Sequence, residues 1–197
     1  MLNVAIIGLG NIGLLYDKDF DDKEKSLSHI KSIFLHPEFK LKYVVDISTQ
    51  YQALITEKFP NVQSFQDYNL IIKKKDIDIL IIATPTQTHL KILKAFQDNK
   101  NIKLFFMEKP LFHNLKEYEN IDKYIQKKIF VNYLRRFDTK LRKLQKKIQK
   151  KKKLIDPNKI VINYCKGLKN NGSHMIDLIN FLFNNPKLLT SKILSKS

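Results

Sequence analysis

Three of the chain's five glycines lie within six residues, in the segment Gly8-Leu9-Gly10-Asn11-Ile12-Gly13. The apolar, β-branched run over residues 4–7 before them is typical of a buried parallel strand. In a G-x-G-x-x-G turn, Gly8 allows the tight turn, Gly10 admits a pyrophosphate, and Gly13 lets the next helix pack closely with its N-terminus facing the phosphates. The backbone contacts to the pyrophosphate are expected from Gly10, Asn11 and Ile12. The segment therefore predicts a dinucleotide site, against the alternative of an ordinary glycine-rich turn.

Asp46 closes the apolar run over residues 41–45 and is the second candidate cofactor residue. An acidic residue at this place in dinucleotide-binding folds accepts hydrogen bonds from the adenosine ribose and repels a 2′-phosphate. We therefore expect NAD or NADP as the cofactor, with Asp46 favouring NAD. Ser48 and Lys42 leave open the accommodation of a phosphate, and an aspartate that only caps a helix is the alternative.

Two more polar segments follow apolar runs and are expected at the same edge of a parallel sheet. Thr84-Pro85-Thr86-Gln87-Thr88-His89 supplies hydroxyl groups and a helix start, although Thr86 alone is compatible with a plain N-cap and His89 with a structural helix residue. Glu108-Lys109-Pro110 places a lysine beside a glutamate, suited to hold a sugar hydroxyl or stabilise an alkoxide, against an ordinary surface lysine. The residues added to the predicted cofactor site are Thr84, Pro85, Thr86, His89 and Glu108.

The hydrophobic pattern alternates between strands and helices. It predicts strands over residues 4–7, 41–45, 62–65, 78–83, 102–107 and 129–133, and helices over 26–36, 49–58, 67–75, 86–97 and 114–127. Asn114, with Glu117 three residues later, is expected to cap the last of these helices. Short connections of this kind predict an α/β fold, a Rossmann-type doubly wound parallel sheet.

The sheet is expected to close near residue 134, which divides the chain into an NAD(P)-binding Rossmann domain over 1–134 and a partial substrate and oligomerisation domain over 135–197. The second part is predicted as an incomplete α+β domain, with a lysine-rich helix over 139–153, a strand over 159–164 and a helix over 172–183.

The net charge of +17 raises the possibility of nucleic-acid binding. However, only three of the 36 basic residues are arginine, the residue that sequence-reading proteins favour. Residues 139–153 hold nine basic residues and no acid, and Leu141, Leu144 and Ile148 recur there at helical spacing. This pattern indicates an amphipathic helix with a solvated lysine face or, alternatively, a patch that attracts a phosphorylated or nucleotide-linked substrate.

Composition also limits the class of protein. A single cysteine, Cys165, excludes a disulfide framework and a cysteine-based metal cluster, and no metal is expected. Apolar runs stay below the ~18 residues of a membrane helix, and no secretory signal pattern is present. We therefore expect a cytoplasmic protein with no membrane and no nucleic-acid partner.

Five segments occur in the order and spacing of one known family, and the chain resembles the glucose–fructose oxidoreductase / inositol dehydrogenase / MocA (Gfo/Idh/MocA) family over nearly its whole length. The segments are residues 8–13, Ala83-Thr84-Pro85-Thr86-x-x-His89, Glu108-Lys109-Pro110, residues 133–137 and residues 172–178. Ser28-His29 after the acidic loop, with His36-Pro37-Glu38-Phe39, is similar to a subgroup often met in bacterial surface-sugar gene clusters.

The resemblance implies an NAD(P)-dependent oxidation or reduction at a hydroxyl or carbonyl of a sugar, nucleotide sugar or cyclitol, with a role in bacterial surface polysaccharide metabolism as one setting. It implies that Lys109 binds the substrate hydroxyl and assists proton transfer, that His174 is the catalytic acid or base, and that Asp177 orients it. Substrate contacts are implied for Lys109, Tyr133, Arg136, Asn170, His174 and Asp177. Many members carry aspartate where Asn170 stands, which bears on the proton relay.

Family members continue beyond the His174 helix into a broad, mostly antiparallel sheet, whereas this sequence ends at Ser197. The expectation is a truncated or relic chain, or one completed by a partner, with a homo-oligomer as one form. A dinucleotide-binding member without catalysis is the alternative function. A basic nucleic-acid-binding protein would explain the lysine tract but none of the five segments.

Overall fold

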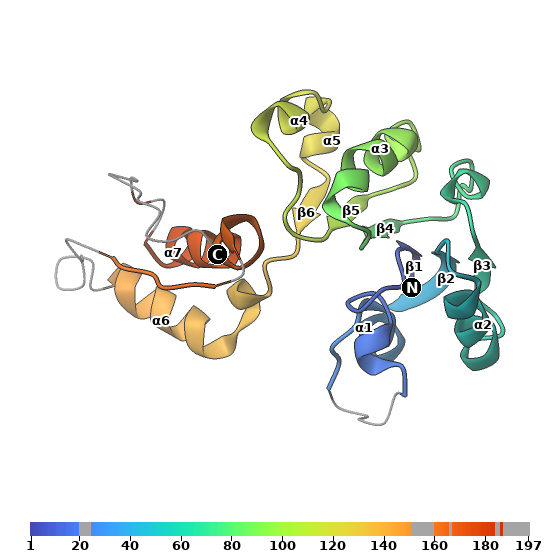
Figure 1. The fold of residues 1–197 in the computed structure, drawn as a ribbon, viewed down its shortest axis with the longest axis horizontal. Helices are drawn as coiled ribbons and strands as arrows, with labels where there is room; N and C mark the ends of the chain where they lie inside the picture. Colours follow the sequence, from blue (N-terminus) through green and yellow to red (C-terminus); the bar gives the residue numbers. More distant parts are fainter. Residues whose placement is uncertain (20–24, 151–159, 166, 184–185, 187–197) are drawn as a thin grey trace. The chain divides into compact units, whose positions relative to one another are not determined.

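The computed structural model describes residues 1–19, 25–150, 160–165, 167–183 and 186 (Figure 1). The chain separates into two compact units, Met1–Asn132 and Tyr133–Ser197. The described strands all belong to the first unit.

The first unit is built on a six-stranded sheet with the strand order β3-β2-β1-β4-β5-β6, whose paired strands are all parallel. The strands are β1 (Leu2–Ile7), β2 (Phe39–Val45), β3 (Gln63–Phe65), β4 (Ile79–Ile82), β5 (Leu104–Met107) and β6 (Ile129–Val131). The strand order turns back at β1 and β4, and in open α/β sheets ligands bind outside the carboxyl ends of the strands at such a point. The predicted Rossmann-type doubly wound sheet is confirmed.

Helices cover both faces of this sheet because successive residues of a strand point to opposite sides. On one face, Val4 and Ile6 of β1 pack with Ile30 and Ile55, from α1 (His29–Leu35) and α2 (Thr49–Lys58). On the other face, Ala5 and Ile7 belong to a core that contains Phe96, from α3 (Thr86–Phe96). The buried runs of β1 and β4 are therefore apolar throughout, as the sequence pattern required.

Two predicted helices of the first unit differ from the structure. The predicted helix 114–127 is two short helices, α4 (Leu115–Glu119) and α5 (Lys123–Gln126). Asn114 caps α4 as expected, since its side chain accepts a hydrogen bond from the Glu117 N–H at 3.1 Å. Asp122 then starts a second helix by accepting from the Tyr124 N–H at 2.7 Å, so a second capping residue divides the segment. The segment 67–75 contains only the 3₁₀ turn η2 (Tyr68–Leu70).

The regular secondary structure in the described part of the second unit is helical. It contains the 3₁₀ turn η3 (Leu134–Phe137), α6 (Thr139–Lys150), the π-helical turn η4 (Gly167–Gly172) and α7 (Ser173–Phe183). The predicted strand 159–164 is wrong for residues 160–164, which have no strand pairing, because no other strand lies in the described part of this unit to complete a ladder. Residues 151–153 and 159 of the predicted elements lie outside the described residues.

Helices α6 and α7 contact each other, and the Gln145 side chain donates a hydrogen bond to the Phe181 carbonyl at 2.8 Å. Of the predicted apolar stripe of α6, Ile148 is buried and Leu144 is exposed. No helix among the described residues is long and apolar enough to cross a membrane.

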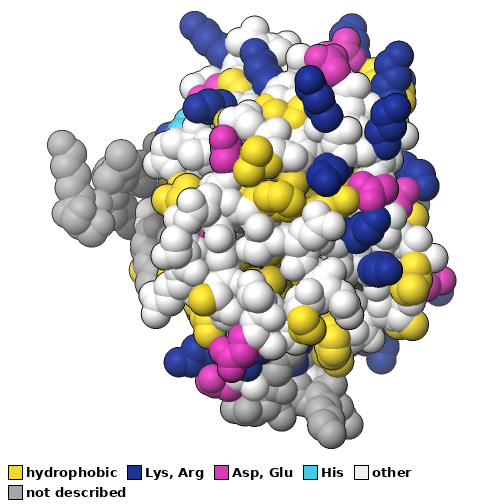
Figure 2. Space-filling view, turned by 90° about the vertical axis from the view of Figure 1, so that its right-hand side faces the viewer, with side chains coloured by type: hydrophobic (Ala, Val, Ile, Leu, Met, Phe, Trp, Pro, Cys, Tyr) yellow, Lys and Arg dark blue, Asp and Glu magenta, His cyan; other side chains and the backbone are white. Residues whose placement is uncertain are grey.

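The basic side chains are distributed rather than gathered on the face drawn in Figure 2. Lysine and arginine side chains are spread over this face and alternate there with acidic and apolar side chains. Two of the lysines of the first unit are paired with acids at the sheet: Lys42 with Asp76, and Lys103 with Asp78.

Candidate cofactor and active site

The glycine turn that follows β1 requires two of its glycines for steric reasons. Gly8 has φ +99°, and a Cβ atom there would lie 2.7 Å from the Ala83 carbonyl carbon. A Cβ on Gly13 would lie 2.2 Å from the Gly8 oxygen. Glycine is the residue that tolerates both a positive φ and such close backbone approach. The predicted tight turn at Gly8 and close packing at Gly13 therefore correspond to real contacts.

Gly10 has the opposite environment, because a Cβ built there would have no heavy atom within 4 Å. Among the described residues, no acceptor receives a hydrogen bond from the N–H groups of Gly10, Asn11 or Ile12. Unpaired N–H groups beside open space suit an anion. The turn therefore fits the pyrophosphate of a dinucleotide.

A pocket of about 430 Å³ opens beside this turn, at the carboxyl ends of β1, β2 and β4. Its wall is mostly apolar, and its polar lining includes the Asp46 carboxylate and the Thr84 and Thr88 hydroxyls. The lining residues from the strand ends and the glycine turn include Gly8, Gly10, Asp46, Ile47, Thr84 and Pro85. An apolar pocket with few polar groups, next to an anion-binding turn, suits the adenosine part of a dinucleotide.

A connection of fifteen residues separates Gly13 from α1, in agreement with the helix predicted over residues 26–36. The Leu14 N–H donates to the Gly10 carbonyl at 2.9 Å, which closes one turn, and the 3₁₀ turn η1 (Leu15–Asp17) follows. The α-helix α1 begins only at His29, whose N–H donates to the Ile12 carbonyl at 2.9 Å. The N-terminus of α1 thus lies at the glycine turn, after the connection over residues 14–28, and its orientation toward the phosphates stays a prediction.

Asp17 holds the returning end of this connection. Its Oδ2 atom accepts hydrogen bonds from the Leu27 and Ser28 N–H groups at 2.7 and 2.6 Å, and the buried Lys31 ammonium pairs with Oδ1 at 3.4 Å. Burial works to raise the pKa of Asp17, but the hydrogen bonds from Ser28 and Leu27 outweigh it and leave that pKa below its usual value. The predicted loop over residues 17–25 thus begins with a buried anchor, and its residues 20–24 lie outside the described residues.

Asp46 is bound by backbone N–H groups on both of its oxygens. Oδ2 accepts from the Leu9 N–H at 2.6 Å and Oδ1 from the Ser48 N–H at 2.8 Å. The cap of α2 is Ser48, whose side chain accepts from the Tyr51 N–H, so the interpretation of Asp46 as a helix cap is wrong. Lys42 pairs with Asp76 and does not line the pocket, which removes it as a phosphate ligand there.

The β4–α3 segment contributes Thr84 and Pro85 to the pocket. Pro85 is the N-cap residue of α3 and Thr86 its first helical residue, so the alternative of Thr86 as an N-cap is wrong. The Thr88 hydroxyl lies 2.7 Å from both the Thr84 hydroxyl and the Pro85 carbonyl. These contacts fix the first turn of α3 against the end of β4.

His89 is fully buried, with 0% of its surface exposed, and joins two loops. Its Nε2 atom lies 2.8 Å from the Thr84 carbonyl and its Nδ1 atom 2.9 Å from the Leu111 carbonyl. A neutral imidazole can donate to only one of these oxygens and an imidazolium to both. Through these two contacts, His89 connects the β4–α3 loop to the segment after Lys109.

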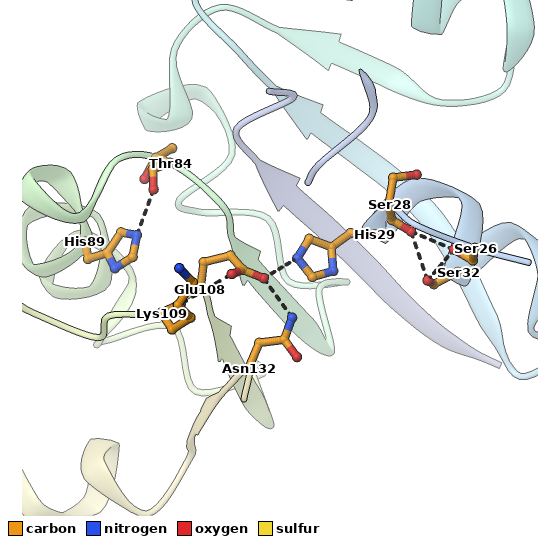
Figure 3. Close-up of polar contacts among 9 residues, drawn as sticks. All are labelled: Ser26, Ser28, His29, Ser32, Thr84, His89, Glu108, Lys109 and Asn132. Atoms are coloured by element: carbon orange, nitrogen blue, oxygen red, sulfur yellow. Dashed lines mark hydrogen bonds and ion pairs between the residues drawn. The ribbon is translucent and has the colours of Figure 1, made fainter. Parts of the chain in front are cut away.

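Glu108 directly follows β5 and is buried, with 9% of its surface exposed (Figure 3). Its Oε1 atom accepts hydrogen bonds from His29 Nε2 at 2.9 Å and Asn132 Nδ2 at 2.7 Å, and Oε2 accepts from the Lys109 N–H at 3.3 Å. Burial works to raise the pKa of this carboxyl, but the hydrogen bonds from His29 and Asn132 outweigh it, and the pKa lies below its usual value. Glu108 is therefore an ionised, fixed group beside Lys109.

The predicted substrate residues of the second unit are also brought together among themselves. The Arg136 guanidinium binds both oxygens of Asp177, with Nε at 2.9 and 2.8 Å and a terminal nitrogen 2.6 Å from Oδ1. The His174 ring packs edge-on against Tyr133, with 5.7 Å between ring centroids. Burial raises the pKa of the Tyr133 hydroxyl. Asn170 contributes its carbonyl, which accepts from the Ser173 hydroxyl at 3.0 Å.

Lys109 belongs to the first unit and His174 to the second. Their convergence on one cleft stays a prediction.

The family model described as an oxidoreductase family with an NAD-binding Rossmann fold, GFO_IDH_MocA, matches residues 2–133. The chain belongs to the Gfo/Idh/MocA family. The match covers the glycine turn, Asp46, Thr84 and the Glu108-Lys109 segment.

Curated relatives in the family include the uncharacterized oxidoreductase YrbE of Bacillus subtilis, 28% identical over 68% of this chain and 36% of its own length. Another is the myo-inositol 2-dehydrogenase of Thermotoga maritima, 24% identical over 70% of this chain and 37% of its own length. The matched region thus spans little more than a third of these relatives.

Similar solved structures support the same fold. The myo-inositol dehydrogenase of Lactobacillus casei, in complex with NAD(H) and myo-inositol, has a TM-score of 0.67 at 20% identity and covers 93% of this chain and 55% of its own. The scyllo-inositol dehydrogenase of the same organism, with NAD(H) and scyllo-inositol, has a TM-score of 0.69 at 18% identity and covers 93% and 56%.

Two buried polar residues of this Gfo/Idh/MocA chain were missed as parts of the site. His29 was noticed only in the Ser28-His29 pair, and Asn132 had no signal other than its place directly after β6. Both contact Glu108, from 79 and 24 residues away in the sequence. The strand order could have predicted the position of Asn132. This residue follows β6, which pairs with β5 in parallel, so it lies at the same edge of the sheet as Glu108.

Proposed function

We propose that this chain binds NAD(H) or NADP(H) at the glycine turn and serves an oxidoreductase that acts on a hydroxyl or carbonyl group of a sugar, nucleotide sugar or cyclitol. The observation that carries the proposal is the environment of Gly10, where open space and three N–H groups without a described acceptor lie beside the pocket that Asp46 lines. Family membership and the inositol dehydrogenases among the relatives support the same class of reaction.

Each part of the proposed cofactor site has a distinct task. The N–H groups of residues 10–12 hold the pyrophosphate, and the Asp46 carboxylate accepts hydrogen bonds from the adenosine ribose hydroxyls. Because Asp46 is an acid and Lys42 is paired elsewhere, the preferred cofactor is NAD. When bound, the nicotinamide ring supplies hydride transfer.

The proposed catalytic residues are Lys109 and His174. Lys109 holds the substrate oxygen, and His174 accepts the hydroxyl proton during oxidation and returns it during reduction. The substrate itself is held by Tyr133, Arg136, Asn170 and Asp177. The bidentate Arg136–Asp177 pair supports this arrangement by fixing one turn of α7 that lies next to His174.

Two measurements on the purified chain test the proposal. Titration calorimetry with NADH and NADPH is expected to give binding, with NADH the tighter ligand. Oxidation of a panel of inositols, free sugars and nucleotide sugars is then followed by the absorbance of NADH, and a nucleotide sugar as the best substrate would support the surface polysaccharide setting.

Lys109→Met is expected to lower turnover by about 10²-fold or more while NADH binding stays within about twofold, since a group acting on the proton leaves the phosphate contacts alone. Lys116→Met, which changes an exposed lysine of α4, is the matched control. A wild-type chain that binds neither nucleotide would sink the cofactor assignment. Equal turnover in Lys109→Met and Lys116→Met would sink the catalytic one.

A further inference from the structure

His29 is a buried histidine that lies between the glycine turn and Glu108. It is the first residue of α1, with 8% of its surface exposed, and its ring packs edge-on against Phe106 of β5 at 5.4 Å between centroids. Its backbone N–H donates to the Ile12 carbonyl in the glycine turn at 2.9 Å. Its Nε2 atom lies 2.9 Å from Glu108 Oε1. One residue thus contacts the turn through its backbone and Glu108 through its side chain, the contact that Figure 3 shows.

The Glu108 carboxylate is held at both oxygens, from three elements. Oε1 receives the His29 and Asn132 donors, and Oε2 receives the N–H of Lys109, the residue that follows. A carboxylate fixed on both sides cannot rotate without losing a hydrogen bond inside a buried site, which is costly. The orientation of Glu108 therefore constrains the backbone from which the Lys109 side chain extends.

We propose that His29 is a positioning residue, which locks the Glu108 carboxylate and thereby sets the Lys109 segment relative to the glycine turn. The part of this inference that concerns Lys109 rests on the proposed function, whereas the part that concerns Glu108 does not. His29 donates through Nε2, so the ring serves in its neutral tautomer and equally as imidazolium. Nothing in this role requires His29 to touch substrate or cofactor.

The connection over residues 14–28 gives this role its physical basis. The chain returns at Ser28, which caps α1, and the Asp17 carboxylate holds the Leu27 and Ser28 N–H groups. His29 is therefore fixed at its own backbone before its side chain reaches Glu108. Because the backbone of His29 is fixed, its side chain holds the Nε2 donor in a defined position.

The test measures the titration of Glu108 directly, by NMR of protein labelled with ¹³C at glutamate carboxyl carbons and assigned with Glu108→Gln. His29→Leu keeps the site apolar and removes one donor, so the pKa of Glu108 is expected to rise by about one unit or more, because burial remains while a hydrogen bond to the charged form is lost. His29→Gln supplies an amide donor and is expected to restore at least half of that shift. His36→Gln, at the exposed C-terminal end of the same helix, is the matched control and is expected to leave the Glu108 signal unchanged.

A second readout separates positioning from general damage to the fold. His29→Leu leaves the His29 N–H bond to Ile12 intact, so the NADH dissociation constant is expected to stay within about threefold while turnover falls by about tenfold or more. His29→Gln is expected to recover most of the turnover. An unchanged Glu108 titration in His29→Leu would overturn the proposal, as would equal turnover in wild type and His29→Leu.

The outcome remains decisive if the leucine variant does not fold. In that case ¹⁵N histidine spectra of wild type and Glu108→Gln are compared, and the His29 ring signals are expected to move while those of His36 stay. Unmoved His29 signals would refute the contact. Failure of the proposed function has a separate signature, namely wild-type protein that binds no nucleotide, and the Glu108 titration tests His29 even then.

Discussion

Asp46 and Glu108 are two carboxylates at the carboxyl edge of one sheet, and their surroundings differ. Asp46 lines an open pocket and is bound by two backbone N–H groups, from Leu9 and Ser48. Glu108 is buried and is bound by two side chains and one backbone N–H. Asp46 accepts one hydrogen bond on each oxygen and lines the pocket, so a lone pair on each oxygen stays available to a ligand, whereas Glu108 accepts three hydrogen bonds and is buried. The difference separates a binding region from a positioning region.

Substitutions in the glycine turn are expected to have the largest effects, and they test whether binding and stability depend on different residues. Gly8→Ala puts a Cβ against the Ala83 backbone at a positive φ, and the expected loss of unfolding free energy is about 3 kcal/mol or more. Gly10→Val places its Cβ in open space, so stability is expected to change by less than about 1 kcal/mol while NADH binding weakens by about 100-fold or more. Thermal melting and calorimetry of both variants check this contrast, and undiminished NADH binding in Gly10→Val would contradict it.

Glu108→Gln tests the positioning region by stability rather than binding. At pH 7 the variant is expected to lose about 1–3 kcal/mol of unfolding free energy, because hydrogen bonds to a buried charged group are lost. The folded-state pKa of Glu108 is lowered, since its hydrogen bonds outweigh burial. Its stabilising contribution is therefore complete above the unfolded pKa of about 4.3 and is lost as the pH falls below it.

Urea unfolding of wild type and Glu108→Gln between neutral and acid pH measures that difference. The gap between the two proteins is expected to narrow as the pH falls below about 4. A gap that stays constant with pH would mean that Glu108 is not ionised in the folded protein. Asp17, Asp76 and Asp78 also have lowered pKa values, and because both proteins contain them, their effect cancels in the comparison.

Asp46→Ala is expected to have the smallest effect on binding among these changes, because it removes one ribose acceptor and leaves the N–H groups of residues 10–12 in place. NADH binding is expected to weaken by about tenfold, or 1.4 kcal/mol, and NADPH binding by less, because the alanine no longer repels a 2′-phosphate. Calorimetry with both nucleotides measures the ratio. Equal losses for the two nucleotides would mean that Asp46 does not discriminate at the ribose.

The sequence predicted the sheet of the first unit better than the segments outside it. Strand runs such as residues 78–83 are continuous and apolar because both faces of a parallel sheet are covered, and this signal is local. The π-helical turn at Gly167–Gly172 was not predicted. The predicted strand over 159–164 is wrong for residues 160–164, because a strand depends on a partner elsewhere in the chain. The division of 114–127 into two helices was missed since Asp122 was not recognised as a second cap.

The candidate site shows the same limit. Gly8 and Asp46 each directly follow a strand of one βαβ unit, and Gly13 belongs to the glycine turn, so their places could be predicted. His29 reaches Glu108 across 79 residues of sequence, after a long connection from the glycine turn to α1. His89 was predicted near the cofactor, but its contacts with the Thr84 and Leu111 carbonyls depend on a loop that no periodicity describes.

The long connection over residues 14–28, between the glycine turn and α1, affects which changes of sequence length this protein tolerates. The chain leaves after Gly13 and rejoins at His29, and Asp17 ties the two ends together through the Leu27 and Ser28 N–H groups. Loop-closure entropy grows slowly, by about 0.6 kcal/mol for each doubling of loop length. A change of length between Asp17 and Leu27 is therefore expected to cost little folding free energy, as long as the contacts of Asp17 keep His29 in place. The connection between Gly13 and His29 is therefore a place where longer or different loops can form beside the glycine turn without a change in the sheet.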